Sequence, residues 1–231
     1  MNKKAIIIFS KTPELSKRSP DEPYSGLPWT DLDALFFAMF DDVIELVNSM
    51  SAIDLYVVKS SADISNEYMH KSGFNAQIIE SQGKTIGEEI HHVFDTMFSK
   101  KYEQVVILLD PNPLVTKREL RVVFDILHYD DDCIVVGEYG DGKYYLLGLK
   151  SNHSDVFEND VTVRIQELLM GFCKRDMMIF PMLPKYSLDN GTNLYRLKND
   201  LEEISGGNGF SIRTRTMFKT LDKKYKIRRP H

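Results

Sequence analysis

Short apolar runs recur along the chain, and none of them shows a regular alternation of apolar and polar residues. The five runs are AIIIF (5–9), IDLYVV (53–58), AQIIE (76–80), QVVILL (104–109) and CIVVG (133–137). Their short length and β-branched composition are typical of strands that are covered on both faces, as in parallel sheets. The pattern therefore predicts a sheet that lies in the interior of the protein.

Amphipathic helical patterns separate these runs. Apolar residues recur at a spacing of three or four over 32–47, 86–97 and 120–127, with most charged residues off that face. Because strands and helices alternate, the pattern predicts an α/β protein with a doubly wound sheet in a three-layer α/β/α arrangement. The sheet is expected to be mainly parallel.

Two of the predicted helices carry a start signal. Thr85 stands three residues before Glu88, and Thr116 stands three residues before Glu119. This is the spacing of the capping box, in which the two side chains accept hydrogen bonds from the first free N–H groups of a helix. We therefore expect helices to begin after Thr85 and after Thr116.

The alternation changes after the fifth run. The stretch 133–150 reads as two strands joined by a Gly-rich turn, and 144–147 within it reads as a half-buried strand. This hairpin makes the predicted sheet mixed. A helix near 160–174, a strand at 177–183 and a short helix near 192–203 are expected to follow.

Composition is that of a globular protein. Of the 231 residues, 42% are hydrophobic and 27% are charged, and the formal net charge is −5. A chain of this length fits one large domain, and its bulk charge does not favour binding to polyanions such as nucleic acid. We expect one domain over 1–204.

The last part of the chain differs in charge. SGGNG (205–209) breaks the pattern, and 211–231 holds eight Lys or Arg residues against one Asp. We expect 205–231 to be a basic tail that adds little to the core. Its scattered apolar residues could form a patch against the domain or against a second copy in a homodimer; they are Ile212, Met217, Phe218 and Leu221.

The first apolar run bears on location. It has only five residues, which is too short for a signal peptide or a membrane span, so we expect a cytoplasmic protein. Cys133 and Cys173 lie far apart in apolar segments and show no metal-ligand or redox spacing. We expect both to be buried, reduced thiols.

Chemically useful residues follow several predicted strands. In an open α/β sheet, ligands bind beyond the carboxyl ends of the strands. Ser10 and Lys11 follow the first strand, Asp110 follows the fourth, Gly137 lies at the end of the fifth, and Asp189 follows the late strand and a loop. Carboxylates in such places suit a divalent metal bound to a diphosphate, and a lysine offsets phosphate charge.

Each acidic candidate also has a purely structural interpretation. Asp110 precedes Pro111 and is a usual residue for ending a strand in a turn. Asp141 precedes Gly142, which is the composition of a hairpin turn. Asp189 could open the following helix. The residues alone leave both interpretations open.

Taken in order, five stretches resemble a known family: KKAIIIFSKTP, QGKTIGEEIHHVF, VVILLD, GEYGDGKYYLLGL and YSLDNGTNL. They resemble a family of small bacterial GT-A-like proteins that comprises glycosyltransferases and nucleotide-diphospho-sugar transferases. This family is similar to the molybdopterin and phospholactate nucleotidyltransferases. The resemblance extends over residues 3–201.

The resemblance implies a nucleotide or nucleotide-sugar ligand and a Mg²⁺ or Mn²⁺ cofactor. It also implies roles for six positions: Lys11 and Pro13 in the nucleotide-binding loop, Asp110 as the metal-binding acid, Asp141 and Gly142 in the pocket hairpin, and Asp189 in a late acidic loop. Ser10 and Gly137 join the nucleotide-binding candidates by their places beside these positions.

The chain departs from the family pattern at the expected site. Lys143 stands where the family has a second hairpin glycine, and the stretch around Asp110 lacks the usual Gly-Ser. The first loop lacks Lys-Thr-Arg-Leu, and the late loop has one acid fewer. Three hypotheses follow. The first is a glycosyl- or nucleotidyltransferase that uses a nucleotide-activated substrate and a metal; the alternative is a degenerate member that serves as a binding or assembly module. The third is that the basic tail docks the protein on nucleic acid.

Overall fold

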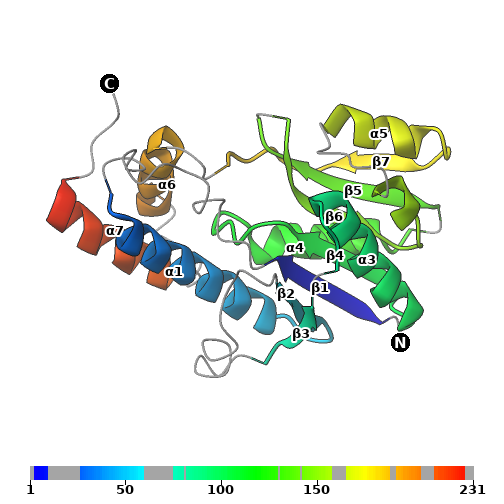
Figure 1. Ribbon diagram of the computed structural model, residues 1–231, viewed down its shortest axis with the longest axis horizontal. Helices are drawn as coiled ribbons and strands as arrows, with labels where there is room; N and C mark the ends of the chain where they lie inside the picture. The colour runs from blue at the N-terminus through cyan, green and yellow to red at the C-terminus, as the bar shows by residue number, and fades with distance from the viewer. Residues whose placement is uncertain are drawn as a thin grey trace.

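The protein is a sheet with helices on both faces (Figure 1). The computed structural model describes residues 3–9, 27–59, 75–80, 82–129, 131–140, 142–157, 165–187, 191–203 and 211–226. The strands are β1 (Lys4–Phe9), β2 (Asp54–Lys59), β3 (Gln77–Glu80), β4 (Gln104–Leu108), β5 (Cys133–Glu138), β6 (Tyr144–Leu149) and β7 (Met178–Pro181). The helices are α1 (Trp29–Asn48), α3 (Ile86–Ser99), α4 (Lys117–Ile126), η3 (Ser154–Phe157), α5 (Ile165–Cys173), α6 (Gly191–Glu203) and α7 (Ile212–Tyr225). The predicted three-layer α/β/α class is confirmed.

The sheet has the strand order β3-β2-β1-β4-β6-β5-β7. β1 lies between β2 and β4 and runs parallel to both, with Ile7 opposite Tyr56 on one side and Ile107 on the other. This confirms that the first and fourth apolar runs are neighbouring parallel strands. β6 runs antiparallel to its two neighbours, so the sheet is mixed, as the hairpin predicted.

β1 shows why the apolar runs are unbroken. Ile6 and Ile8 pack on the face covered by α1 and α4, whereas Ala5, Ile7 and Phe9 pack on the face covered by α3 and α5. Successive side chains of a strand point to opposite faces, and here both faces are buried. A strand in this position therefore has no polar face to display.

β6 is more deeply buried than its sequence suggests. The stretch 144–147 is expected to be half-buried, but all six residues of β6 are buried. The reason is its place in the sheet, since Leu147 lies opposite both Ile107 of β4 and Val136 of β5. A strand between two others, under helices on both faces, has no exposed side.

One predicted capping box forms fully and the other forms in part. At α4, the Thr116 hydroxyl accepts a hydrogen bond from the Glu119 N–H at 3.2 Å, and the Glu119 carboxylate accepts one from the Thr116 N–H at 2.8 Å. At α3, the Thr85 hydroxyl accepts from the Glu88 N–H at 3.2 Å. The Glu88 carboxylate instead accepts a hydrogen bond from the backbone N–H of Lys84, one residue before the cap.

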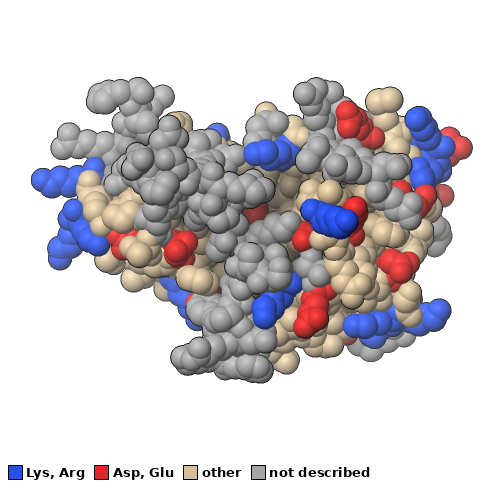
Figure 2. All heavy atoms as spheres, viewed as in Figure 1, with Lys and Arg blue, Asp and Glu red and all other residues tan. Residues whose placement is uncertain are grey.

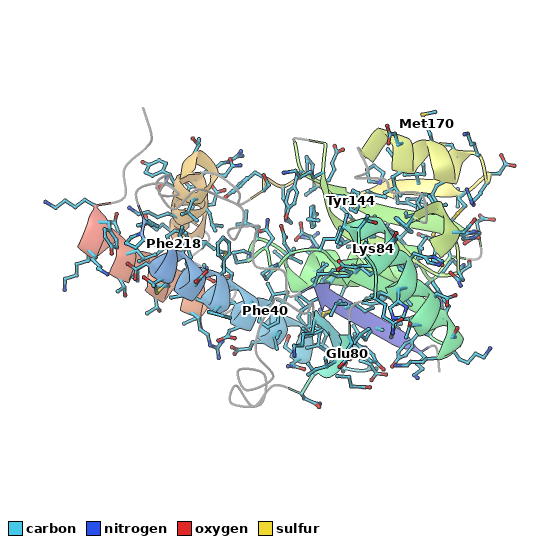
Figure 3. All side chains as sticks on the ribbon, in the orientation of Figure 1. Phe40, Glu80, Lys84, Tyr144, Met170 and Phe218 are labelled. Atoms are coloured by element: carbon cyan, nitrogen blue, oxygen red, sulfur yellow. The ribbon has the colours of Figure 1, made fainter. Side chains whose placement is uncertain are left out.

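A second packed region lies beside the sheet and is here called the helical cluster. It joins the first half of α1 to α6 and α7, which Figure 1 shows away from the sheet faces. In Figure 3, Phe218 of α7 lies in this region, whereas Phe40 lies farther along α1, where it packs toward the sheet. The buried residues of the cluster are Leu27, Leu32, Leu35, Phe36, Met39, Leu194, Leu197, Leu201, Phe218 and Leu221.

The start of α7 is capped by a side chain of α1. The Asp42 carboxylate, which is 4% exposed, accepts hydrogen bonds from the N–H groups of Arg213 at 3.1 Å and Thr214 at 2.8 Å. It also accepts from the Thr214 hydroxyl at 2.6 Å. The Arg213 guanidinium bonds to Glu45 of the same helix. A buried carboxylate from a distant segment thus satisfies the free N–H groups of this helix start.

The expectation that the segment after residue 205 adds little to the core is wrong for α7, whereas the apolar patch against the domain that the sequence allowed is present. Phe218 and Leu221 are buried against α1 and α6, and Met217 packs against them, whereas Ile212 is 58% exposed. Apolar contact and the Asp42 cap together hold the helix on the domain. The boundary of the domain near residue 204 and the homodimer stay predictions.

Three further observations bear on the surface. Cys133 is buried as expected, but Cys173 is exposed, because it ends α5 on the solvent side. None of the helices in the described ranges is long and apolar enough to cross a membrane. Figure 2 shows acidic and basic side chains interspersed on the face drawn, with basic ones at the end formed by α7.

Candidate functional site

The carboxyl edge of the sheet brings together three of the predicted positions. Asp110 follows β4, Gly137 lies in β5, and Gly142 lies in the turn before β6. The chain leaves β1 at this same edge, because Ile8 pairs with Leu108 at the end of β4. The other predicted site residues lie outside the described residues; they are Ser10, Lys11, Pro13, Asp141 and Asp189.

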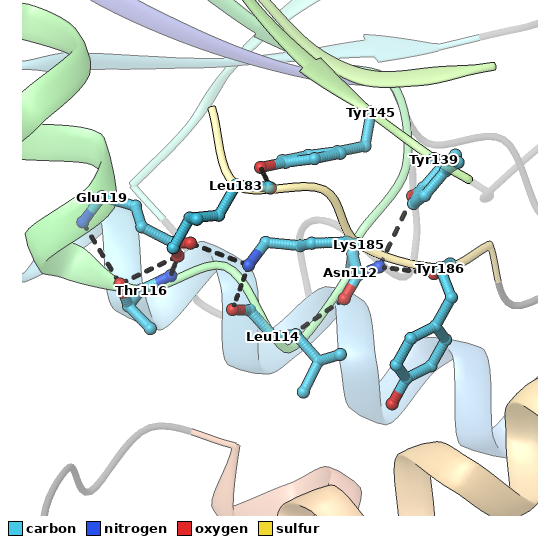
Figure 4. A network of polar contacts seen from close by, with 9 residues as sticks. All are labelled: Asn112, Leu114, Thr116, Glu119, Tyr139, Tyr145, Leu183, Lys185 and Tyr186. Atoms are coloured by element: carbon cyan, nitrogen blue, oxygen red, sulfur yellow. Dashed lines mark hydrogen bonds and ion pairs between the residues drawn. The ribbon is translucent and has the colours of Figure 1, made fainter. Parts of the chain in front are cut away.

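Asp110 is held by a tyrosine that the sequence did not single out. The Tyr139 hydroxyl donates a hydrogen bond to Asp110 Oδ2. Asn112 Nδ2 lies 3.5 Å from the same hydroxyl and donates to the backbone carbonyl of Tyr186 at 3.3 Å (Figure 4). Asn112 Oδ1 accepts from the Leu114 N–H at 3.0 Å. The loop after β4 is therefore tied both to the hairpin and to the segment after β7.

Tyr139 stays protonated in this environment. Burial raises its pKa well above the ordinary value of 10.0, and the nearby negative charge of Asp110 raises the pKa further. Both effects disfavour a phenolate, because a buried anion beside a carboxylate loses hydration and meets a like charge. The phenol is therefore a hydrogen-bond donor over the whole physiological pH range.

The lysine in this network serves the structure. Lys185 Nζ lies 2.9 Å from Glu119 Oε1 and donates to the Leu114 carbonyl at 2.9 Å (Figure 4). Its side chain is only 9% exposed, and the ammonium lies 5.6 Å from the centre of the Tyr145 ring. These contacts fix the segment after β7 to the start of α4. Because Glu119 balances the charge of Lys185, this lysine is not a candidate phosphate ligand.

The packing of a neighbouring aromatic ring explains why position 137 is a glycine. A Cβ atom at this position would lie 2.5 Å from Cζ of the Tyr145 ring, which crosses directly over the glycine. The Tyr145 hydroxyl donates to the Leu183 carbonyl at 3.1 Å, so the ring is fixed at both ends. The absence of a side chain at Gly137 thus makes room for an aromatic ring, and a nucleotide contact there stays a prediction.

Gly142 shapes the hairpin turn. Its φ is +84°, in the left-handed region that favours glycine, and its N–H donates to the Tyr139 carbonyl at 3.1 Å. The Tyr139 N–H donates in turn to the Lys143 carbonyl at 2.7 Å. The hairpin turn predicted from Asp-Gly is therefore present, and Lys143 is exposed beside it.

The donor set fits a metal that arrives with its phosphate ligand better than a preformed ion site. Among the described residues, no three acidic, His or Cys side chains are grouped closely enough to hold a metal ion. Asp110 offers a carboxylate, and Mg²⁺ commonly uses one or two protein carboxylates together with substrate phosphates and water. Asp110 therefore fits a metal–diphosphate complex.

Sequence reasoning missed Tyr139, Asn112 and Lys185. Asn112 stands between two prolines directly after a strand, which marks a shaped turn, and Tyr139 stands directly before the hairpin glycines. These two positions could have been identified from the sequence. Nothing in the sequence marks Lys185, because its role depends on the β-bridge between Tyr139 and Lys185 that places the late segment beside β5.

Similar folds occur in solved structures of proteins named as transferases or synthases. A provisionally named nucleotide-diphospho-sugar transferase from Desulfovibrio desulfuricans G20 matches with a TM-score of 0.80 and 18% identity over 96% of each chain. The 4-diphosphocytidyl-2C-methyl-D-erythritol synthase of Anaerococcus prevotii DSM 20548 matches with a TM-score of 0.59 and 11% identity, over 87% of this chain and 96% of the synthase.

A cytidylyltransferase from Leptospira borgpetersenii serovar Hardjo-bovis strain JB197 matches with a TM-score of 0.55 and 11% identity, over 100% of this chain and 98% of the enzyme. At these identities the likeness shows a shared fold alone, and that fold agrees with the one that the sequence resemblance implied. No curated protein sequence matches this chain.

The sequence also matches a family model directly. The model is that of DUF2064, described as "Uncharacterized protein conserved in bacteria", and it matches residues 43–162. This stretch is just over half of the chain and includes Asp110, Asn112, Tyr139 and the β5–β6 hairpin. On this match, the protein belongs to the DUF2064 family.

Proposed function

We propose that this protein is a transferase that binds a nucleotide-activated substrate at the carboxyl edge of its sheet. The observation that carries the proposal is the place of Asp110, directly after β4 and bonded to the β5–β6 hairpin. The fold is shared with enzymes whose names specify nucleotide-diphospho-sugar and cytidylyl transfer. In open α/β sheets this edge is where ligands bind.

The proposed nucleotide site has two sides. Ser10, Lys11 and Pro13 would contact the nucleotide from the loop after β1, with the Lys11 ammonium offsetting phosphate charge. The hairpin would form the opposite rim through Gly142 and Asp141, beside Gly137. The nucleotide would thus lie between the ends of β1, β4 and β5.

The proposed metal is Mg²⁺ or Mn²⁺. Asp110 would hold it, together with Asp189 from the late loop. When bound, such an ion neutralises diphosphate charge and stabilises the leaving group. The contribution of the chain would be to orient the substrate and to hold Asp110 in place, without a covalent nucleophile.

Two reactions fit this site, glycosyl transfer and nucleotidyl transfer. Both start from a metal-bound diphosphate or triphosphate in the same pocket, so the Asp110 geometry favours neither. If the protein binds the nucleotide sugar but does not convert it, it would instead be the binding module that the sequence left as an alternative. Product analysis after incubation with nucleoside triphosphates and nucleotide sugars separates these outcomes.

Isothermal titration of wild type and Asp110→Asn with a panel of nucleotide sugars, with and without Mn²⁺, tests the proposal. We expect Mn²⁺-dependent binding in wild type and its loss in Asp110→Asn. The apo variant should be about as stable as wild type, because an amide oxygen still accepts from Tyr139. Asp125→Asn, on the exposed face of α4, is the matched control and should bind as wild type does.

Equal heats from wild type and Asp110→Asn would contradict the metal-binding role. Wild type that binds no member of the panel, with or without Mn²⁺, would contradict the nucleotide site as a whole.

A further inference from the structure

We propose that Tyr139 is a positioning residue that fixes the Asp110 carboxylate for a divalent metal, and that Asn112 sets the direction of the Tyr139–Asp110 hydrogen bond. The inference rests on the proposed function, because it concerns the same metal. It adds two residues, neither of which the sequence resemblance implicates.

The orientation of the Asn112 amide follows from its backbone partners. The Leu114 N–H can only donate, so the amide atom 3.0 Å from it must be the oxygen. The Tyr186 carbonyl can only accept, so the amide atom 3.3 Å from it must be the nitrogen. Both requirements agree, and the flipped amide would violate both. The amide therefore has one orientation (Figure 4).

This orientation directs the Tyr139 hydroxyl. Asn112 Nδ2 faces the hydroxyl at 3.5 Å, which is a long contact, but it presents hydrogen atoms to the phenol oxygen. The hydroxyl hydrogen is disfavoured on that side and needs an acceptor elsewhere. Asp110 Oδ2 is that acceptor. The chain of donors thus runs from Asn112 through Tyr139 to Asp110.

The tyrosine itself cannot easily move. Tyr139 is 4% exposed, and its ring lies 5.5 Å from the Tyr145 ring, centre to centre. Asn112 is 1% exposed, so the far end of the chain is also fixed. A carboxylate with one oxygen held by a rigid donor has lost much of its rotational freedom before any metal binds. Partners of this kind commonly orient metal-binding carboxylates.

The same chain of bonds reaches a distant helix. The Tyr186 backbone carbonyl accepts from Asn112, and the Tyr186 hydroxyl donates to Asp200 of α6 at 2.7 Å. Tyr186 and α6 are therefore connected to Asp110 through these hydrogen bonds.

A matched pair of variants tests the inference. Tyr139→Phe removes the hydroxyl that bonds to Asp110 and keeps the ring. Tyr145→Phe removes the neighbouring hydroxyl, whose partner is the Leu183 carbonyl. The probe is Mn²⁺, titrated into each protein alone and together with each nucleotide sugar of the panel, and followed by the electron paramagnetic resonance signal of the free ion. Thermal melting of both variants reports any general damage.

We expect Tyr139→Phe to bind Mn²⁺ about 10-fold more weakly, or worse, as is usual when a partner of a metal ligand is removed. Tyr145→Phe should bind Mn²⁺ as wild type does, although it also loses a buried hydrogen bond. Any nucleotide binding that remains without metal should be the same in wild type, Tyr139→Phe and Tyr145→Phe. A merely structural role of Tyr139 would lower the melting temperature without this selective loss of Mn²⁺ affinity.

Unchanged Mn²⁺ affinity in Tyr139→Phe would overturn the inference. Tighter binding would overturn it as well, because Tyr139 would then compete with the metal for Asp110. Asp110→Asn separates this failure from failure of the proposed function. If Asp110→Asn loses Mn²⁺ and Tyr139→Phe keeps it, only the positioning role is wrong. If wild type binds Mn²⁺ neither alone nor with a nucleotide sugar, or if Asp110→Asn binds it normally, the metal-binding role of Asp110 and the positioning role of Tyr139 are both wrong.

Discussion

The sheet and the helical cluster bury their apolar side chains in different ways. In the sheet, backbone hydrogen bonds join the strands, and unbroken apolar runs fill the space under helices on both faces. In the helical cluster, α1 meets α6 and α7 through one apolar stripe, and charged side chains join the helices at its border. Those links include Asp42 to Thr214, Asp31 to Lys224 at 2.9 Å and Lys198 to Asp222 at 2.7 Å.

This difference has consequences for stability. Burial of the sheet core excludes water from large apolar areas and does not depend on any single polar group. The helical cluster depends on fewer apolar residues and on the buried Asp42 cap. Its other charged contacts are partly exposed, so they contribute little and respond to conditions. We therefore expect the cluster to open at a lower free energy than the sheet, as a separate local unit.

Deletion of residues 206–231 should have the largest effect on this comparison. It removes Phe218 and Leu221, whose burial contributes about 1.5–3 kcal/mol each. It also uncovers the apolar stripes of α1 and α6. We expect the melting temperature to fall by on the order of 10 °C, since about 2–4 °C corresponds to 1 kcal/mol in a domain of this size. Scanning calorimetry measures the shift.

A fall of only a few degrees on that deletion would show that the burial of Phe218 and Leu221 contributes little to the stability of the whole domain. A deletion protein that is unfolded altogether would instead show that the sheet cannot stand without the cluster.

Asp42→Ala should have an intermediate effect. It leaves the N–H of Thr214 and the hydroxyl of Thr214 without their buried acceptor, at a cost of roughly 1–3 kcal/mol. Glu45→Ala removes a half-exposed ion pair with Arg213 and should cost less than about 1 kcal/mol. Urea unfolding measures both costs.

Hydrogen exchange then locates the Asp42→Ala effect. The amides of α7 should exchange faster in this variant, while those of β4 keep their protection at a given urea concentration. Uniform loss of protection in α7 and β4 would contradict the separation of the two regions.

Acid should produce the smallest effect. The hydrogen bond from the Tyr225 hydroxyl, at 2.5 Å, and then that from Lys224 hold the pKa of Asp31 below its ordinary value of 3.8. Because the folded-state pKa is depressed, the contribution of Asp31 is fully present above that ordinary value. It is lost as the pH falls through the depressed value.

We therefore expect the α1–α7 contact to loosen below about pH 4, more than the sheet does. The measurement compares exchange of α7 amides in wild type and Asp31→Asn at equal pH. The two proteins should differ near pH 6, and the difference should shrink as the pH falls below about 4. A difference that persists unchanged to the lowest pH would argue against the Asp31 carboxylate as the cause.

The sheet could be predicted from sequence because its signals are local. The apolar composition of runs such as 5–9 and 104–109 is enough to predict that they are buried. The capping box of Thr116 needs only Glu119, three residues away. The helical cluster has no such signal. Arg213 is one of many basic residues in its segment, and its acidic partners lie about 170 residues earlier, in α1. The charge count of the sequence predicts a basic tail, but it cannot predict that acidic residues of α1 neutralise part of that positive charge.

In the candidate site, too, some residues could be predicted from the sequence and others could not. Asp110 was predicted, because its position after a strand is a local property and the fold then places it at the carboxyl edge. Tyr139 and Asn112 were missed because what matters about them is a contact between the loop after β4, the hairpin and the segment after β7. That contact exists only once the strand order is known. The packing of Tyr145 over Gly137 was hidden for the same reason.

The central position of β6 also has a consequence for synthesis on the ribosome. β1, β2, β3 and β4 can pair as soon as the chain reaches residue 108. Among the described strands, the partner of the outer edge of β4 is β6, which ends at Leu149. At 5–20 residues per second, the intervening stretch takes about 2–8 s to emerge. During this interval β4 presents a row of unpaired N–H and C=O groups beside an apolar surface, and such an edge invites pairing with another nascent chain. The hairpin that turns at Gly142 ends this exposure, because it delivers β6 to the open edge of β4.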